Sequence, residues 1–168
     1  DLAELVDVLD RELESDTPLA AYVTLFLAVL EAETGLLRYV NAGHNPPVLL
    51  AVGQPAARLG PTGIVLGVVA DATYQAMDVT LGPGDRLLLY TDGVTEAANP
   101  ADEEYGDVRL EAYVRDRRGE PGRELLDGIV ADVLRFCDAA RPPDDMTLMC
   151  LDRGSPTPAL PASGPPER

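Results

Sequence analysis

The chain has 168 residues, of which 46% are hydrophobic, so it is long enough to bury the core of one domain. Its formal net charge of −16 at pH 7 argues against binding nucleic acid, because a phosphate backbone needs a basic surface. Two cysteines and a single histidine, His44, exclude a disulfide framework, a four-thiolate zinc site and a histidine-based zinc site.

The first part of the chain predicts a helix followed by a β-hairpin. Apolar residues recur every three or four positions from Leu2 to Leu13, which is typical of an amphipathic helix, and Thr17-Pro18 closes it. The apolar run Tyr22 to Leu30 predicts a strand buried on both faces. A glycine-containing turn then leads into a second strand at residues 36–42.

The middle of the chain predicts further strands separated by glycine and proline. Val48 to Val52 returns as a third strand, and residues 53–67 predict a loop with short extended pieces. Alternating residues predict a half-buried strand from Thr73 to Leu81. The apolar run Arg86 to Tyr90 predicts another strand, which ends just before Asp92-Gly93.

The last third predicts two helices and a final strand. The helices begin at Tyr105-Gly106, with the acidic residues 102–104 at the N-terminus of the first, and at Arg123, which opens an apolar stripe reaching Cys137. Met146 to Leu151 predicts the final strand, and the Pro-rich residues 153–168 predict a disordered tail. Hairpins followed by late helices indicate the α+β class with largely antiparallel sheets.

Two acidic sites stand next to apolar strands. Asp92 follows one strand and precedes Gly93, whose missing side chain lets backbone or ligand approach closely. Asp144-Asp145 precedes the final strand, and adjacent carboxylates repel each other unless a cation or several donors lie nearby. Hard cations such as Mg²⁺ and Mn²⁺ take oxygen ligands, so the two sites could form part of a metal centre. The alternatives are an ordinary Asp-Gly turn and solvated loop acids.

Three other side chains allow more than one interpretation. His44 lies in a Gly-His-Asn-Pro turn, where it could bind a ligand, donate a proton or fix the loop. Cys137 lies on the apolar face of the last helix and Cys150 within the final apolar strand. Both thiols are therefore expected to be buried in the core.

Three segments in this order carry a family resemblance: residues 39–47 (YVNAGHNPP), 90–97 (YTDGVTEA) and 144–148 (DDMTL). Together they resemble the PPM (PP2C-like) serine/threonine phosphatases, in particular the bacterial SpoIIE/RsbU-type branch. The resemblance covers residues 1–152 and implies an α-β-β-α sandwich of two antiparallel sheets flanked by helices. It matches the C-terminal part of that domain and implies that the N-terminal strands are missing.

The resemblance also implies an activity and a site. Members of the family hydrolyse phosphoserine or phosphothreonine in a regulatory protein, using water activated by two Mn²⁺ or Mg²⁺ ions. By motif, Asp92 and Asp144 are implied as metal ligands, with Asp145, Gly93 and His44 as surrounding or alternate ligands. The implied substrate is a STAS-type anti-sigma-factor antagonist.

The departure from the family pattern lies at the front of the chain. Family members carry earlier Asp-containing motifs that supply a bridging carboxylate, and these do not occur here. We therefore expect the chain to be a fragment with negligible activity in isolation. The alternative is a non-catalytic module with a degenerate phosphatase fold that binds a partner protein. Without an apolar run of roughly 20 residues or a signal-peptide pattern, a cytoplasmic location is expected.

Overall fold

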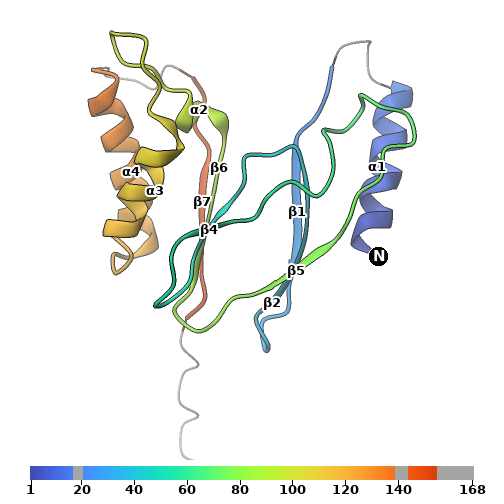
Figure 1. Ribbon diagram of the computed structural model, residues 1–168, viewed down its shortest axis with the longest axis horizontal. Coiled ribbons are helices and arrows are strands. Elements are labelled where there is room, and N and C mark those ends of the chain that lie inside the picture. The colour runs from blue at the N-terminus through green and yellow to red at the C-terminus, as the bar shows by residue number, and fades with distance from the viewer. Residues whose placement is uncertain (17–20, 139–143, 155–168) are drawn as a thin grey trace, which may run out of the picture.

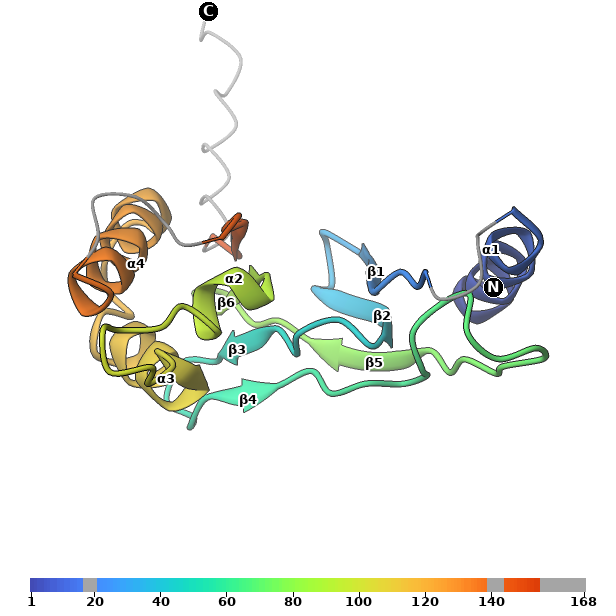
Figure 2. The same cartoon turned by 90° about the horizontal axis from the view of Figure 1, so that it is seen from above.

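A computed structural model describes residues 1–16, 21–138 and 144–154 and arranges them in four layers (Figure 1). Helix α1 (Leu2–Asp16) covers the outside of one sheet, and α3 (Gly106–Asp116) and α4 (Gly122–Phe136) cover the outside of the other. Seen from above, the two helical layers lie at opposite ends of the molecule with the strands between them (Figure 2). The predicted α-β-β-α sandwich and the α+β class are confirmed.

The first sheet contains β1 (Leu25–Leu30), β2 (Leu36–Ala42) and β5 (Met77–Thr80), in the order β1-β2-β5 and all antiparallel. The predicted hairpin is confirmed, with Gly35 supplying the positive φ of +77° that its turn requires. The prediction that its first strand is buried on both faces is wrong. Because β1 is the outer strand of this sheet, Val29 remains 59% exposed.

The second sheet has the order β4-β3-β6-β7 and is also antiparallel throughout. Its register pairs Arg86 with Asp152 at one end of the β6–β7 ladder and Tyr90 with Leu148 at the other. The strands, in chain order, are β3 (Val48–Leu50), β4 (Ala57–Arg58), β6 (Arg86–Tyr90) and β7 (Leu148–Asp152).

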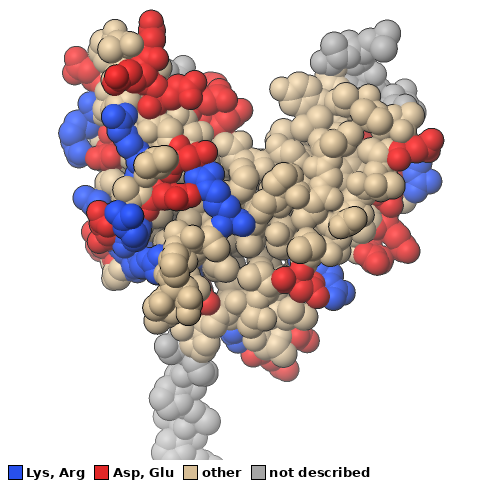
Figure 3. All heavy atoms as spheres, viewed as in Figure 1, with Lys and Arg blue, Asp and Glu red and all other residues tan. Residues whose placement is uncertain are grey.

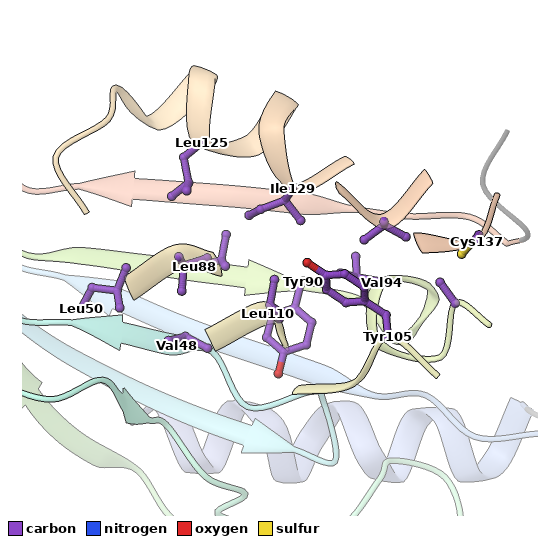
Figure 4. Packing of buried hydrophobic residues seen from close by; sticks show 13 residues of the cluster. Val48, Leu50, Leu88, Tyr90, Val94, Tyr105, Leu110, Leu125, Ile129 and Cys137 are labelled. Atoms are coloured by element: carbon purple, nitrogen blue, oxygen red, sulfur yellow. The ribbon is translucent and has the colours of Figure 1, made fainter. Parts of the chain in front are cut away.

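The largest core lies between the second sheet and helices α3 and α4 (Figure 4). The predicted apolar stripe of α4 turns toward the sheet, where Leu125 and Ile129 are fully buried against Leu88 and Tyr90 of β6. Each such aliphatic side chain removed from water stabilises the fold by roughly 1.5–3 kcal/mol. This core fixes β6 in place, and β6 leads directly into the candidate site.

The structure differs from the sequence predictions at several positions. Asp92–Thr95 forms a short helix, α2, where the sequence offered an Asp-Gly turn as one alternative. Residues 102–104 lie in the loop before α3 and not in its first turn, and Asp102 there adopts a φ of +60°. Cys137 is buried as predicted, whereas Cys150 is only half-buried because β7 is the outer strand of its sheet.

The predicted end of the first helix and the predicted C-terminal tail are only partly within the described residues. Thr17-Pro18 and residues 155–168 lie outside the described residues. Arg153, which the sequence placed at the start of the tail, donates hydrogen bonds to the backbone carbonyls of Glu33 (3.0 Å), Thr34 (3.1 Å) and Leu81. The packed domain therefore includes this side chain.

Candidate metal centre

Asp92 stands where a rigid strand turns into a helix. β6 ends at Tyr90, and Thr91 is the N-cap of α2, with φ −92° and ψ 162°. The backbone carbonyl of Thr91 accepts a hydrogen bond from the N–H of Val94 at 3.1 Å, which closes the first turn of α2. The carboxylate of Asp92 is exposed and accepts a hydrogen bond from the N–H of Gly93 at 2.9 Å.

Asp144 and Asp145 approach the same end of the sheet from the other direction. Both are exposed, and the Asp144 carboxylate accepts a hydrogen bond from the N–H of Asp145 at 2.7 Å. Because Tyr90 pairs with Leu148 in an antiparallel ladder, the residues after Tyr90 lie opposite those before Leu148. Register alone therefore brings the two acidic sites to one sheet end.

Gly93 shows how tightly the two segments meet. A Cβ atom placed on Gly93 would lie 2.4 Å from the carbonyl oxygen of Asp145 and 3.7 Å from the Cβ of Asp144. The first distance is far below any ordinary contact, so a glycine is required for the backbone of α2 to touch the Asp144–Asp145 segment. The close approach that the sequence suggested at Gly93 is made by protein backbone.

His44 reaches the site from a third element. It lies in the loop that carries the chain from β2 in the first sheet to β3 in the second. Burial lowers the pKa of His44 below its ordinary value of 6.5, while the negative charge of Asp92 opposes this shift. The imidazole is therefore mainly neutral at pH 7 and lies within electrostatic range of Asp92.

A fully buried asparagine holds the His44 loop, and sequence reasoning did not single it out. The side-chain carbonyl of Asn41 accepts a hydrogen bond from the N–H of His44 at 2.9 Å, and its amide donates to the carbonyl of Leu59 at 3.1 Å. The only available signal was its position inside the 39–47 motif. A buried side-chain amide whose carbonyl and NH₂ groups are both hydrogen-bonded holds a loop firmly, because the loss of either partner leaves a buried polar atom without a hydrogen bond.

The charge around the site is negative. Figure 3 shows a hollow at the top of the molecule between the two sheets, with acidic side chains along the rim on the α2 side. The ion pairs among the described residues involve other carboxylates and do not reach Asp92, Asp144 or Asp145. Carboxylates without an ion-pair partner on adjoining segments at one sheet end favour a bound cation.

The donor set fits a hard divalent cation in part. Asp92 and Asp144 offer carboxylate oxygens, the ligands that Mg²⁺ and Mn²⁺ prefer. In the described part of the chain, however, no group of three His, Cys, Asp or Glu side chains is placed to hold a metal ion. By themselves the two carboxylates would be an incomplete set of protein ligands for such an ion, which would have to keep several waters.

Comparison with known proteins agrees with the layered fold. The profile of the family described as Stage II sporulation protein E (SpoIIE) matches residues 1–154. The chain belongs to this family. The SpoIIE-family chain is 33% identical over 135 residues to the protein IcfG of Synechocystis, covering 80% of the chain and 21% of IcfG. It is 26% identical over 155 residues to the phosphoserine phosphatase RsbU of Bacillus subtilis, covering 90% and 45%.

Solved structures show the same fold. The SiaA-PP2C domain of Pseudomonas aeruginosa superposes with a TM-score of 0.78 at 22% identity, covering 90% of the SpoIIE-family chain and 61% of that domain. The phosphatase domain of SpoIIE from Bacillus subtilis gives a TM-score of 0.64 at 17% identity, covering 94% and 70%. The chain therefore has the fold of these PP2C-type domains.

The chain is shorter than its relatives, and its helices are not membrane-spanning in the described residues. The SpoIIE-family chain spans less than half the length of IcfG and of RsbU. None of the helices in residues 1–16, 21–138 and 144–154 has both the length and the hydrophobicity to cross a bilayer.

Proposed function

We propose that this chain is part of a metal-dependent phosphatase that removes phosphate from phosphoserine or phosphothreonine in a regulatory protein. The observation that carries the proposal is the contact at Gly93, which holds the segments of Asp92 and Asp144 together at one sheet end. Family membership supports the reaction, since the relatives RsbU and RsbP are both named phosphoserine phosphatases.

In this proposal Asp92 and Asp144 hold Mn²⁺ or Mg²⁺, and Asp145 is an alternate ligand beside them. Such an ion supplies a Lewis acid that activates water and neutralises charge on the phosphoryl oxygens. The protein then needs no nucleophile of its own. In this proposal His44, which lies within electrostatic range of Asp92, is a candidate hydrogen-bonding group beside that carboxylate.

The negative charge of the site makes metal dependence a physical requirement of the proposal. A phosphorylated side chain carries about −1.5 to −2 charges at pH 7, so the carboxylates of Asp92, Asp144 and Asp145 repel it. Two opposite charges 4 Å apart gain about 4 kcal/mol near a protein surface, so a divalent cation between the carboxylates and the phosphate attracts both and offsets much of this repulsion. Substrate binding should therefore be stronger with the cation than without it.

For the substrate we propose a phosphorylated STAS-type anti-sigma-factor antagonist. The support comes from relatives: the chain resembles RsbU and RsbP, and it superposes on a Mycobacterium tuberculosis structure that combines RsbU and RsbW domains. The surface of the chain agrees with a protein substrate better than with nucleic acid, because its net charge of −16 repels a phosphate backbone.

The test is a phosphopeptide assay on the full-length protein with and without Mn²⁺, comparing the natural sequence with Asp92→Asn. We expect turnover only with the metal, and a loss of at least about 10²-fold in the variant because a charge-stabilising group at the reaction centre is gone. Thermal stability without metal should stay the same or rise, since one repelling charge is removed. Asp127→Asn, which removes an exposed carboxylate on α4, is the matched control and should retain full activity. Metal-independent turnover, or full activity of Asp92→Asn, would refute the proposal.

A further inference from the structure

The side chain of Thr91, the N-cap residue of α2, forms its hydrogen bonds to the neighbouring strand and not to its own helix. An N-cap threonine ordinarily uses its hydroxyl to accept a hydrogen bond from a backbone N–H in the first turn of its own helix. Thr91 makes no such capping bond. Its hydroxyl oxygen instead accepts a hydrogen bond from the backbone N–H of Thr147 at 2.9 Å and lies 3.5 Å from the carbonyl oxygen of Asp145, to which it can donate.

The register of β6 and β7 explains this arrangement. Tyr90 and Leu148 are the last residues paired in the ladder, so Thr91 and Thr147 face each other at the next position. The N–H of Thr91 donates to the carbonyl of Thr147 at 3.1 Å, as in an ordinary hydrogen-bonded pair. The return bond would use the carbonyl of Thr91, but that carbonyl already accepts from Val94 in the first turn of α2. The hydroxyl takes the place of the missing carbonyl.

The Thr91 hydroxyl therefore extends the strand pairing by one step, past the point where the backbone of β6 has turned into a helix. Thr147 lies three residues after Asp144, and the 3.5 Å contact reaches Asp145, which is adjacent to Asp144. On the opposite side, Asp92 follows Thr91 directly. The Thr91 side chain thus links its own segment, which carries Asp92, to the segment that carries Asp144 and Asp145.

We propose that Thr91 is a positioning residue that holds the Asp144 segment in register beside Asp92 and so sets the metal affinity of this pair. The inference rests on the proposed function, because it assigns Asp92 and Asp144 to a cation. Thr91 does not contact the cation in this proposal. Its hydroxyl acts by satisfying the N–H of Thr147, which otherwise loses its acceptor within the protein.

The experiment measures Mn²⁺ binding to the full-length protein by titration calorimetry, together with the hydrogen-exchange rate of the Thr147 amide. Thr91→Val keeps the shape of the side chain and removes the hydroxyl. We expect it to weaken Mn²⁺ binding about tenfold, the lower end of the effect of losing a group that orients a ligand. Exchange of the Thr147 amide should become faster. Thr91→Ser, which retains the hydroxyl, should stay within about threefold of the natural protein on the same scale.

Thr147→Val is the matched control, because it makes the same chemical change at the facing position. The side chain of Thr147 is exposed, and the hydrogen bonds of this residue described here use only its backbone. Binding and exchange in this variant should match the natural protein. A purely structural role for Thr91 would lower the melting temperature and leave the Mn²⁺ affinity of the folded protein unchanged.

The outcomes separate the inference from the proposed function on which it rests. If Thr91→Val binds Mn²⁺ within twofold of the natural protein while Asp92→Asn has lost binding, the metal site stands and the role of Thr91 is refuted. If Asp92→Asn binds Mn²⁺ normally, the proposed metal site is wrong and the role of Thr91 fails with it. Should Thr91→Val not fold, Thr91→Ala and Thr91→Ser differ by the hydroxyl alone, and equal affinity in that pair also refutes the inference.

Discussion

Replacing Gly93 by alanine tests the contact on which the candidate site depends. The new Cβ would lie 2.4 Å from the carbonyl oxygen of Asp145, and the obstructing atom is backbone, which cannot swing aside as a long side chain can. Non-bonded atoms settle at roughly 3.5 Å, so the start of α2 and the Asp144–Asp145 segment must separate by about 1 Å. The Cβ of Asp144, 3.7 Å away, is already at an ordinary contact distance.

The expected cost combines two opposing effects. Forcing an extra carbon into a packed site destabilises a protein by about 1–3 kcal/mol. Alanine is the better helix former by about 1 kcal/mol in a helix interior, and a short helix such as α2 recovers only part of that gain. We therefore expect a net loss of about 1–2 kcal/mol, which lowers the melting temperature by roughly 3–6 °C for a domain of this size.

Activity should respond more than stability. A displacement of about 1 Å in catalytic geometry can reduce turnover about 10²-fold, so we expect a loss of that order in the Mn²⁺-dependent assay. Gly60→Ala is the control, because nothing lies within 4 Å of a Cβ at that position. Thermal melting and turnover are measured on both variants. A Gly93→Ala protein as stable and as active as Gly60→Ala would show that the two segments do not meet as described.

Two further predictions concern side chains of β6 and β7. Arg86→Met removes a guanidinium that is 10% exposed and paired with Asp152, and should lower the free energy of unfolding by about 2 kcal/mol. Arg38→Met breaks the exposed pair with Asp78 and should lower it by less than about 1 kcal/mol. Equal losses of the two variants in urea unfolding would contradict this. Burial raises the pKa of Cys150 from 9.0 to about 11, so the folded thiol keeps its proton where the unfolded thiol loses it, and the free energy of unfolding should fall as the pH rises from 9 to 11. Cys150→Ala should flatten that fall, and identical slopes would show that the thiol does not titrate differently on folding.

The sequence predicted those elements whose pattern is local. The α4 stripe and β6 were found because apolar spacing and bounding turn residues lie within one short window. β1 was misjudged because a continuous apolar run looks the same in a central strand and in an outer one. α2 has only four residues, too few for any period, and it is held by tertiary packing of its fully buried Val94.

In the candidate site, too, the sequence indicated which residue types are present but not where they lie relative to one another. The residue types at Asp92 and Asp144 suggested oxygen ligands from the sequence alone, but their meeting depends on the pairing of β6 with β7, which lie far apart in the chain. The Asn41 support and the Thr91 hydrogen bond could not be read from the sequence. Each depends on where a backbone N–H points after the chain has folded.

The late position of β7 in the chain has a consequence for the order of folding. α3 and α4 separate β7 from its partner β6, so their pairing is a non-local contact, which forms slowly compared with helices and hairpins. During synthesis, domains fold from the N-terminal side as the chain emerges, and a nascent chain that ends at α4 already contains Asp92 but still lacks Asp144. Until β7 emerges from the ribosome, β6 also remains an open strand edge prone to aggregation. Docking of β7 therefore closes that edge and brings the Asp144 segment beside Asp92 in a single step.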